Sequence, residues 1–194
     1  MALVFRESLH KYLVQEIIIK KKIVDVKSKF QHIQILDTNL FGKILTLDGI
    51  VQVTEKDEAA YSELLAHIPI FSLNNPRNIL IIGGGDGAVA EEVLKHNHVH
   101  SLDLVDIDGK VIEICKKHLT KIHKNIFNNC KLNIFECDAY DFIQSSKKKY
   151  DVIIADRPDP IGAAKVLFKN EFYKNISKTL SINGVAIFQS GVSF

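Results

Sequence analysis

The spacing of hydrophobic and polar positions changes once along the chain, near residue 55. Before that point, short β-branched runs alternate with turn residues, which is typical of strands. The runs lie at 17–19, 23–26, 31–36, 43–47 and 50–54. Asp48-Gly49 separates the last two runs, and this pair is a strong signal for a two-residue hairpin turn. We therefore expect a small antiparallel β-domain over residues 1–54.

Beyond residue 55, the apolar positions follow a helical period and then alternate between strand and helix patterns. Residues 57–72 predict an amphipathic helix. Further strands are expected at 78–83, 101–106, 131–136, 150–155 and 184–189, and helices at 87–96, 109–119, 139–146 and 168–180. This alternation predicts an α/β fold, with a Rossmann-like, doubly wound and mostly parallel sheet over residues 55–194.

The last predicted strand lies close to the end of the sequence, which stops at Phe194. Open sheets of this type usually continue past a strand in that position. We therefore expect the Rossmann-like core to lack a C-terminal segment.

Composition narrows the class of protein. The 194 residues include 25 basic and 23 acidic side chains, mixed along the chain, so no nucleic-acid-binding surface is expected. The lysine runs at 20–22 and 147–149 are short and are interpreted as solvated turns. No apolar run approaches the ~20 residues that span a bilayer, so no membrane association is expected. Three cysteines without a paired spacing, together with the absence of a signal sequence, predict a cytoplasmic protein.

A glycine-rich turn follows the first predicted strand of the core. Gly83 and Gly85 belong to a run in which the backbone can turn tightly and approach a ligand. The spacing from Gly83 to Ala88 also fits the nicotinamide-dinucleotide fingerprint. Asp86 argues against that alternative, because a carboxylate in this turn repels a pyrophosphate and suits a cationic or hydroxyl-bearing ligand.

Acidic residues follow the other predicted strands as well. Because the carboxyl ends of parallel strands share one edge of the sheet, these carboxylates are expected to project from the same edge. The set comprises Asp86, Asp106, Asp138, Asp156 and Asp159. Asp106 lies at the spacing typical of an acid that binds ribose hydroxyls, and Asp138 is placed to accept from an exocyclic amine such as that of adenine. The alternative is that each acid only caps the helix that follows it.

The pair Asp156 and Asp159 emerges into a proline-containing loop. Two carboxylates at the mouth of a cleft can hold an ammonium group, and one can accept its proton when the amine becomes a nucleophile. His96, His98 and His100 alternate along the chain but have no matching set of acids or cysteines, so we expect no metal site.

These features together resemble the polyamine aminopropyltransferase family, of which spermidine synthase is the familiar member. The resemblance runs over nearly the whole chain. It rests on the segments 41–52, 54–58, 66–69, 83–87 and 159–162. It implies an N-terminal β-domain before a Rossmann-like core, a homodimer or homotetramer, and no cofactor. The implied substrates are a di- or polyamine, putrescine first among them, and decarboxylated S-adenosylmethionine as co-substrate.

The resemblance also implies roles for individual residues. Asp156 would be the general base, and Tyr61 would stand beside the attacking amine. The implied contacts of the donor and the amine involve Gln31, Gly83, Gly85, Asp86, Asp106, Asp138, Ala139 and Asp159. Within this set, Asp106 would bind ribose, Asp138 and the backbone of Ala139 would hold adenine, and Asp86 and Asp159 would hold amine groups.

Several positions depart from the family pattern, and they keep two alternatives open. Asp106 replaces a usual Glu, whereas Arg157 and Lys165 add positive charge near the expected amine pocket. A family member that binds nucleoside or polyamine without turnover is one alternative. A methyltransferase that uses ordinary S-adenosylmethionine is the other, although Asp86 and Asp156 would repel the carboxylate of that donor.

Overall fold

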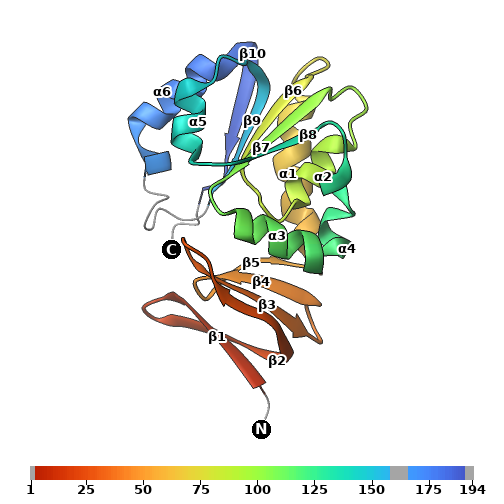
Figure 1. Cartoon of the computed structure of the whole chain (residues 1–194), viewed down its shortest axis with the longest axis vertical. Helices are drawn as coiled ribbons and strands as arrows, with labels where there is room; N and C mark the ends of the chain where they lie inside the picture. The colour runs from red at the N-terminus through yellow and green to blue at the C-terminus, as the bar shows by residue number, and fades with distance from the viewer. Residues whose placement is uncertain (1–2, 158–165, 191–194) are drawn as a thin grey trace.

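The computed structural model describes residues 3–157 and 166–190, and their strands form two five-stranded sheets (Figure 1). The first sheet is antiparallel and follows chain order. Its strands are β1 (Leu3–His10), β2 (Leu13–Lys27), β3 (His32–Thr38), β4 (Lys43–Leu47) and β5 (Ile50–Thr54). Asp48 and Gly49 form the turn between the last two strands and both have positive φ, at 51° and 80°. This combination suits the two-residue hairpin that the sequence predicts.

The prediction of a turn at the lysine run is wrong. Lys20, Lys21 and Lys22 are exposed in the middle of β2, whose pairing with β3 shifts register between Ile19 and Lys21 and again between Lys22 and Val24. Such irregularities let an exposed strand carry consecutive lysines without ending. β1 is an additional strand that the pattern of short β-branched runs did not contain.

The second sheet is parallel, with the order β10-β9-β6-β7-β8. Its strands are β6 (Asn78–Gly83), β7 (Ser101–Asp106), β8 (Leu132–Glu136), β9 (Tyr150–Asp156) and β10 (Leu180–Phe188). From β6 the chain adds strands first on one side and then on the other. The carboxyl end of β6 is therefore the topological switch point, where ligands bind in doubly wound sheets. The predicted fold class, an antiparallel sheet followed by a Rossmann-like sheet, is confirmed.

Helices cover both faces of the parallel sheet (Figure 1). They are α1 (Glu58–Phe71), α2 (Ala88–Leu94), α3 (Gly109–His118), α4 (Thr120–His123), α5 (Ala139–Ser145) and α6 (Asn170–Thr179), with a 3₁₀ turn, η1, at Ile126–Asn128. Residues of β6 alternate between the two cores. Ile79 and Ile81 pack with α1 and α2, whereas Leu80 and Ile82 pack with α5 and α6. No helix within the described residues is long and apolar enough to cross a membrane.

The last strand begins earlier than the sequence predicts. β10 starts at Leu180, directly after α6, and its pairing with β9 is irregular between Leu180 and Val185. Gly184 lies within this irregular part and does not mark the start of the strand. A Cβ at Gly184 would lie 2.9 Å from the carbonyl oxygen of Tyr150, so the close approach of the two strands requires glycine there.

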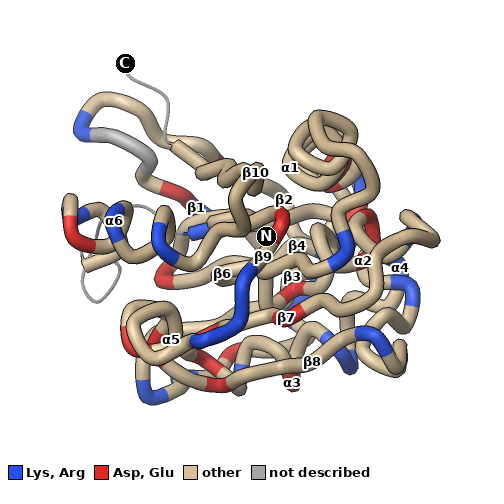
Figure 2. Tube along the Cα trace, turned by 90° about the horizontal axis from the view of Figure 1, so that it is seen from above, with Lys and Arg blue, Asp and Glu red and all other residues tan. Residues whose placement is uncertain are grey.

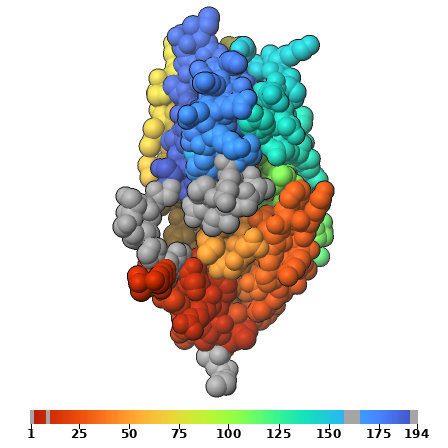
Figure 3. Space-filling view, turned by 90° about the vertical axis from the view of Figure 1, so that its left-hand side faces the viewer, coloured from red at the N-terminus to blue at the C-terminus, as the bar shows by residue number. Residues whose placement is uncertain are grey.

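The two sheets are joined by a shared apolar core. Ile33 and Ile35 of β3 pack with Val111 and Ile114 of α3 and with neighbouring residues of α4. Figure 3 shows the antiparallel sheet at one end of the molecule and the parallel sheet with its helices at the other. This contact places the loop between β2 and β3 against the residues that follow β7.

A buried polar network crosses the parallel sheet. Asp103 of β7 is 3% exposed and accepts hydrogen bonds from Lys148 Nζ at 2.7 Å, Tyr150 Oη at 2.7 Å and Asn133 Nδ2 at 2.8 Å. Burial opposes the charged form, but these hydrogen bonds outweigh it and lower the pKa of Asp103. The carboxylate therefore ties β7 to β8 and β9.

We predict that Asp103→Ala lowers the free energy of unfolding by about 3 kcal/mol, because it strands the fully buried Tyr150 hydroxyl and removes the counterion of Lys148. Tyr150→Phe is the milder control, with an expected loss of about 1 kcal/mol. Urea denaturation measures both changes. An Asp103→Ala protein with the urea midpoint of the unsubstituted chain would show that the network contributes nothing.

Candidate active site

The site is built around the backbone turn that follows β6. Gly83 has a φ of +83°, and a Cβ at this position would collide with the carbonyl oxygen of Asp156 at the end of β9. Gly85 donates its N–H to the Asp106 carboxylate at 3.1 Å, and a Cβ there would lie only 2.6 Å from Asp106 Oδ2. Glycine at these positions therefore allows the ends of β6, β7 and β9 to converge.

Asp86 lies at the far end of this turn. Its Oδ1 accepts a hydrogen bond from the N–H of Ala88 at 2.8 Å. Burial, and after it repulsion from Asp156, raise the pKa of Asp86 to about 7. Asp156 is thus close enough for its charge to disfavour the charged form of Asp86.

Asp156 and Tyr61 meet across the site, although they are 95 positions apart in sequence. The Tyr61 hydroxyl, near the start of α1, donates to Asp156 Oδ1 at 2.6 Å. Burial raises the pKa of Asp156 to about 6, while the tyrosine hydrogen bond opposes the rise. Burial and the charge of Asp156 also raise the pKa of Tyr61, so its hydroxyl stays a proton donor.

Asp106 and its neighbour Asp108 link the two sheets at the site. Asp106 accepts the N–H of Gly85 and, at 2.9 Å, that of Asp108. Burial raises the pKa of Asp106 to about 6 despite these bonds. The buried Asp108 carboxylate accepts Gln31 Nε2 at 2.9 Å and Ser28 Oγ at 2.6 Å. The structure therefore brings Gln31, in the loop between β2 and β3, to the edge of the parallel sheet.

Asp138 stands at the end of the next strand, with Ala139 buried behind it. The N–H of Cys137 binds the carbonyl oxygen of Asp106 at 3.1 Å, which fixes the two strand ends side by side. Asp138 accepts the N–H of Tyr140 at 2.7 Å and thereby caps α5. Capping and ligand binding are both compatible with this position. Asp159 lies outside the described residues.

Two further side chains, Glu58 and Gln189, stand close to this edge and carried no predicted role. Glu58 in α1 accepts from Ser62 Oγ at 3.0 Å, and its charge contributes to the raised pKa of Asp86. Gln189 donates its N–H to Ala155 O at 2.9 Å, and its side-chain oxygen is buried without a hydrogen-bond partner. Glu58 belongs to the 54–58 segment of the resemblance, and Gln189 follows a strand of the parallel sheet. These two sequence positions are the signals from which a role for Glu58 and Gln189 could have been predicted.

Arg157 does not direct its donors to the carboxylates. It is 4% exposed, and its guanidinium donates to the carbonyl oxygen of Leu167 and to Tyr173 Oη. It also stacks on Phe168 at 3.7 Å and lies over Phe188. The positive charge of Arg157, which the sequence analysis expected near the amine pocket, therefore lies against α6 and β10. Lys165 lies outside the described residues.

Positions of basic and acidic residues are spread along the whole backbone trace (Figure 2). Within residues 3–157 and 166–190, no group of three or more His, Cys, Asp or Glu side chains has an arrangement that could hold a metal ion. The site in the described part of the chain thus consists of carboxylates, one phenol and backbone groups.

Comparisons with known proteins match this arrangement to one family. Residues 58–194 match the family described as the spermine/spermidine synthase domain, and residues 3–55 match the spermidine synthase tetramerisation domain. A polyamine aminopropyltransferase of Methanocaldococcus jannaschii is 51% identical over 164 residues, which are 84% of this chain and 56% of that protein. A Buchnera aphidicola relative of the same name is 38% identical over 98% of this chain and 67% of its own length.

Solved structures give the same result. A spermidine synthase in complex with the transition-state analogue AdoDATO superposes with a TM-score of 0.92 at 36% identity, over 95% of this chain and 63% of that one. The spermidine synthase of Thermotoga maritima superposes with a TM-score of 0.89 at 36% identity, over 95% and 62%. The chain thus spans about two thirds or less of the lengths of these proteins.

We predict that Asp86→Asn stabilises the protein at pH 8 by roughly 1–2 kcal/mol, since it removes one of two mutually repelling buried carboxylates. The folded state binds the Asp86 proton more tightly than the unfolded state does, so stability should fall as pH rises from about 4 to 7. The asparagine should flatten that slope in thermal unfolding.

The control is Glu113→Gln, which removes an exposed carboxylate of α3 that pairs with Lys110 at the surface. It should leave the slope unchanged. An unchanged slope in Asp86→Asn would show that the folded protein does not raise the pKa of Asp86.

Proposed function

The chain belongs to the spermine/spermidine synthase family, and from this premise we propose that it is an aminopropyltransferase. It would transfer an aminopropyl group from decarboxylated S-adenosylmethionine to a di- or polyamine, with putrescine as the first candidate. The products would then be methylthioadenosine and, from putrescine, spermidine. The observation that carries the proposal is the convergence of Asp86, Asp156 and Tyr61 at the switch point of the sheet.

The raised pKa values of the two carboxylates are what a site for cations should show. Two buried carboxylates that repel each other are stabilised when a positive charge enters between them. A diamine provides such a charge, and so does the aminopropyl end of the donor. A phosphate ligand would instead add to the repulsion, which argues against a dinucleotide.

Asp156 is the proposed general base. It would take a proton from the attacking ammonium, and the freed nitrogen lone pair would attack the methylene carbon beside the sulfonium. As the new C–N bond forms, the C–S bond breaks and its electron pair goes to sulfur, which becomes the neutral thioether of methylthioadenosine. Tyr61, held 2.6 Å from Asp156, would orient the carboxylate toward the amine. The sulfonium is already activated, so positioning supplies much of the rate.

The donor nucleoside would lie along the ends of β7 and β8. Asp106 would accept from the ribose hydroxyls, Asp138 and the N–H of Ala139 would bind adenine, and Gln31 would close the site from the antiparallel sheet. The open turn at Gly83 and Gly85 would leave room for the sulfonium end. Asp86 would repel the carboxylate of ordinary S-adenosylmethionine, which favours the decarboxylated donor over a methyltransferase reaction.

We also propose a homodimer or homotetramer in the cytoplasm. The match of residues 3–55 to a tetramerisation domain supports the assembly. Val4 and Ile18 are paired across β1 and β2 and are 47% and 66% exposed, so they give one face of the first sheet an apolar surface for a second copy. Free thiols at Cys115, Cys130 and Cys137 fit a reducing compartment.

The decisive assay follows methylthioadenosine release from decarboxylated S-adenosylmethionine with a panel of amines. We predict that Asp156→Asn lowers kcat by about 10²–10⁴-fold, because the amine loses its base. Tyr61→Phe should lower kcat by about tenfold, because the hydrogen bond that orients Asp156 is lost. Both variants should still bind methylthioadenosine in calorimetry.

Glu113→Gln is the matched control and should keep full activity. Turnover by Asp156→Asn at the rate of the unsubstituted chain would exclude Asp156 as the base. Methylthioadenosine binding without turnover by the unsubstituted chain would favour a binding protein, and the absence of both would remove the nucleoside site altogether.

Ile18→Lys tests the assembly. We predict that a charge on the exposed face of β2 converts the oligomer to monomers, as measured by sedimentation velocity, without loss of the folded circular dichroism spectrum. Glu113→Gln, an exposed change on α3 outside the first sheet, serves as the control. A monomeric unsubstituted chain would contradict the proposed assembly directly.

A further inference from the structure

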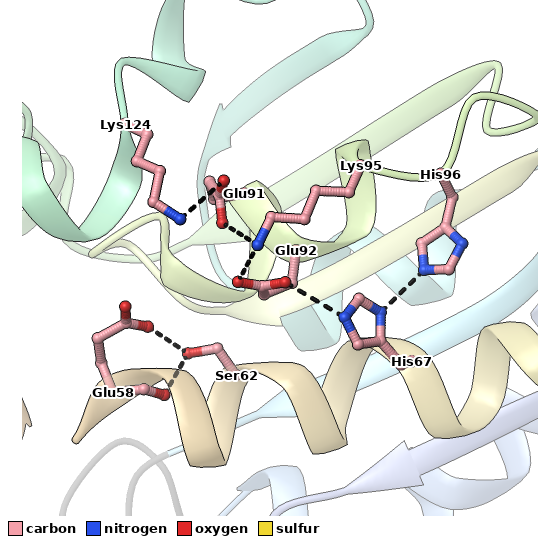
Figure 4. Close-up of polar contacts among 8 residues, drawn as sticks. All are labelled: Glu58, Ser62, His67, Glu91, Glu92, Lys95, His96 and Lys124. Carbon is pink, nitrogen blue, oxygen red and sulfur yellow. Dashed lines mark hydrogen bonds and ion pairs between the residues drawn. The ribbon is translucent and has the colours of Figure 1, made fainter.

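A chain of polar contacts joins α1 to α2 (Figure 4). His67 of α1 lies with its Nδ1 2.9 Å from Nε2 of His96, in the connection after α2. Its other nitrogen, Nε2, lies 3.2 Å from Oε2 of Glu92, which is 2% exposed. Lys95 holds the other Glu92 oxygen at 2.5 Å. The His67–His96 pair is called the histidine clasp below.

The clasp can carry only a limited number of protons. The contact between the two ring nitrogens requires one of them to bear a proton and the other to be bare. The Nε2 of His67 faces Glu92, and the pair can take one further proton before N–H meets N–H. A fully protonated pair would set N–H against N–H and place two positive charges in rings whose centroids are 5.0 Å apart.

We propose that the histidine clasp is a proton-sensitive positioning device, which holds α1 on α2 when at most one of its histidines is charged. α1 also carries Tyr61 and Glu58, and the turn that leads into α2 carries Asp86. Loss of the clasp at low pH would therefore loosen the placement of Tyr61 relative to the site carboxylates.

The surroundings of the clasp support this assignment. His98 lies with its ring 5.4 Å from that of His96, and Phe71 packs against both His67 and His96. Burial and the neighbouring histidines lower the pKa of His96. Phe71 offers no hydrogen bond to either histidine ring. A second proton is thus disfavoured by the geometry and by the environment together.

Other charged groups lie near the contact between α1 and α2, and each forms an ion pair or a hydrogen bond. On α2, Glu91 pairs with Lys95 at 3.1 Å and with Lys124, after α4, at 3.2 Å. Glu58 on α1 has a raised pKa because of burial and is hydrogen-bonded to Ser62. From β9, Asp156 reaches α1 through Tyr61, and Asp86 lies beyond it.

The direction of the pH effect separates the clasp from these carboxylates. A histidine whose pKa is lowered by folding contributes stability above its ordinary value of about 6.5, and this contribution is lost as pH falls toward the folded pKa. Carboxylates with raised pKa values act in the opposite direction, since they make the fold more stable as pH falls. The two contributions can therefore be told apart by their sign.

The first measurement is thermal unfolding, and it compares the 194-residue chain with three variants. His96→Gln can keep a hydrogen bond to His67 without titrating, His96→Phe keeps the ring but not the hydrogen bond, and His100→Gln removes an exposed histidine of the same connection. Between pH 7.5 and 5.0, the Tm of the unsubstituted chain should fall by about 2–4 °C relative to that of His96→Gln. His100→Gln should follow the unsubstituted chain.

Histidine NMR provides the second measurement, and it does not depend on the proposed function. His96 should titrate below the ordinary value, and its pKa should rise in His67→Gln. A His96 that titrates at or above the ordinary value, or a His96→Gln protein with the pH profile of the unsubstituted chain, would overturn the proposal.

The kinetic measurement separates positioning from simple stabilisation. Where the aminopropyl transfer is observed, His96→Phe should lower kcat by about threefold to tenfold at pH 7.5 with unchanged binding of methylthioadenosine. His96→Gln should restore kcat. Equal kcat values in all three proteins would limit the clasp to the stability of the fold. A chain without turnover would leave the Tm and NMR results as the test.

Discussion

The close approach of like charges at the carboxyl end of β6 is the constraint on which the rest of the structure depends. Asp86 and Asp156 are brought together by a backbone that only glycine allows at Gly83, where any side chain would meet the Asp156 carbonyl group. The fold keeps both carboxylates at an electrostatic cost, visible in their raised pKa values. A cleft lined by carboxylates that repel each other binds a cation more tightly than a neutral cleft of the same shape.

The antiparallel sheet has a direct part in the site. Its contact with α3 forms a separate apolar core. This core fixes the loop before β3 against the residue pair Asp106 and Asp108. Gln31 is held by Asp108, and Asp108 also caps α3. Movement of one sheet against the other would therefore disturb the proposed nucleoside side of the site first. It would reach the proposed amine side later, because Tyr61 and Asp156 both belong to the larger unit.

Sequence patterns predicted the fold well where local chemistry and tertiary packing agree. The buried strands β6 and β7 match the predicted ranges because an apolar run between turn residues has few other solutions. The lysine run was predicted as a turn because its charge was considered without its partner strand. The start of β10 was predicted too late, at residue 184, because Gly184 was interpreted as the boundary between helix and strand. The family resemblance implied that Tyr61 and Asp156 both stand near the amine, but it did not predict the hydrogen bond between them. The histidine clasp could not be predicted, because its members come from α1 and the connection after α2.

The raised pKa of Asp156 has a consequence for base catalysis. An aliphatic ammonium has an ordinary pKa near that of lysine, about 10.4, so an exposed aspartate would be a poor acceptor of its proton. Burial raises the pKa of the carboxylate, and the same burial disfavours a charged amine, so the gap between the two groups narrows from both sides. Tyr61 works against the first effect, because its hydrogen bond stabilises the charged carboxylate. That bond keeps Asp156 ionised near neutral pH, and an ionised carboxylate is the form that can accept the proton. As the proposed base, Asp156 is thus balanced between two requirements, and the balance depends on where α1 places the Tyr61 phenol.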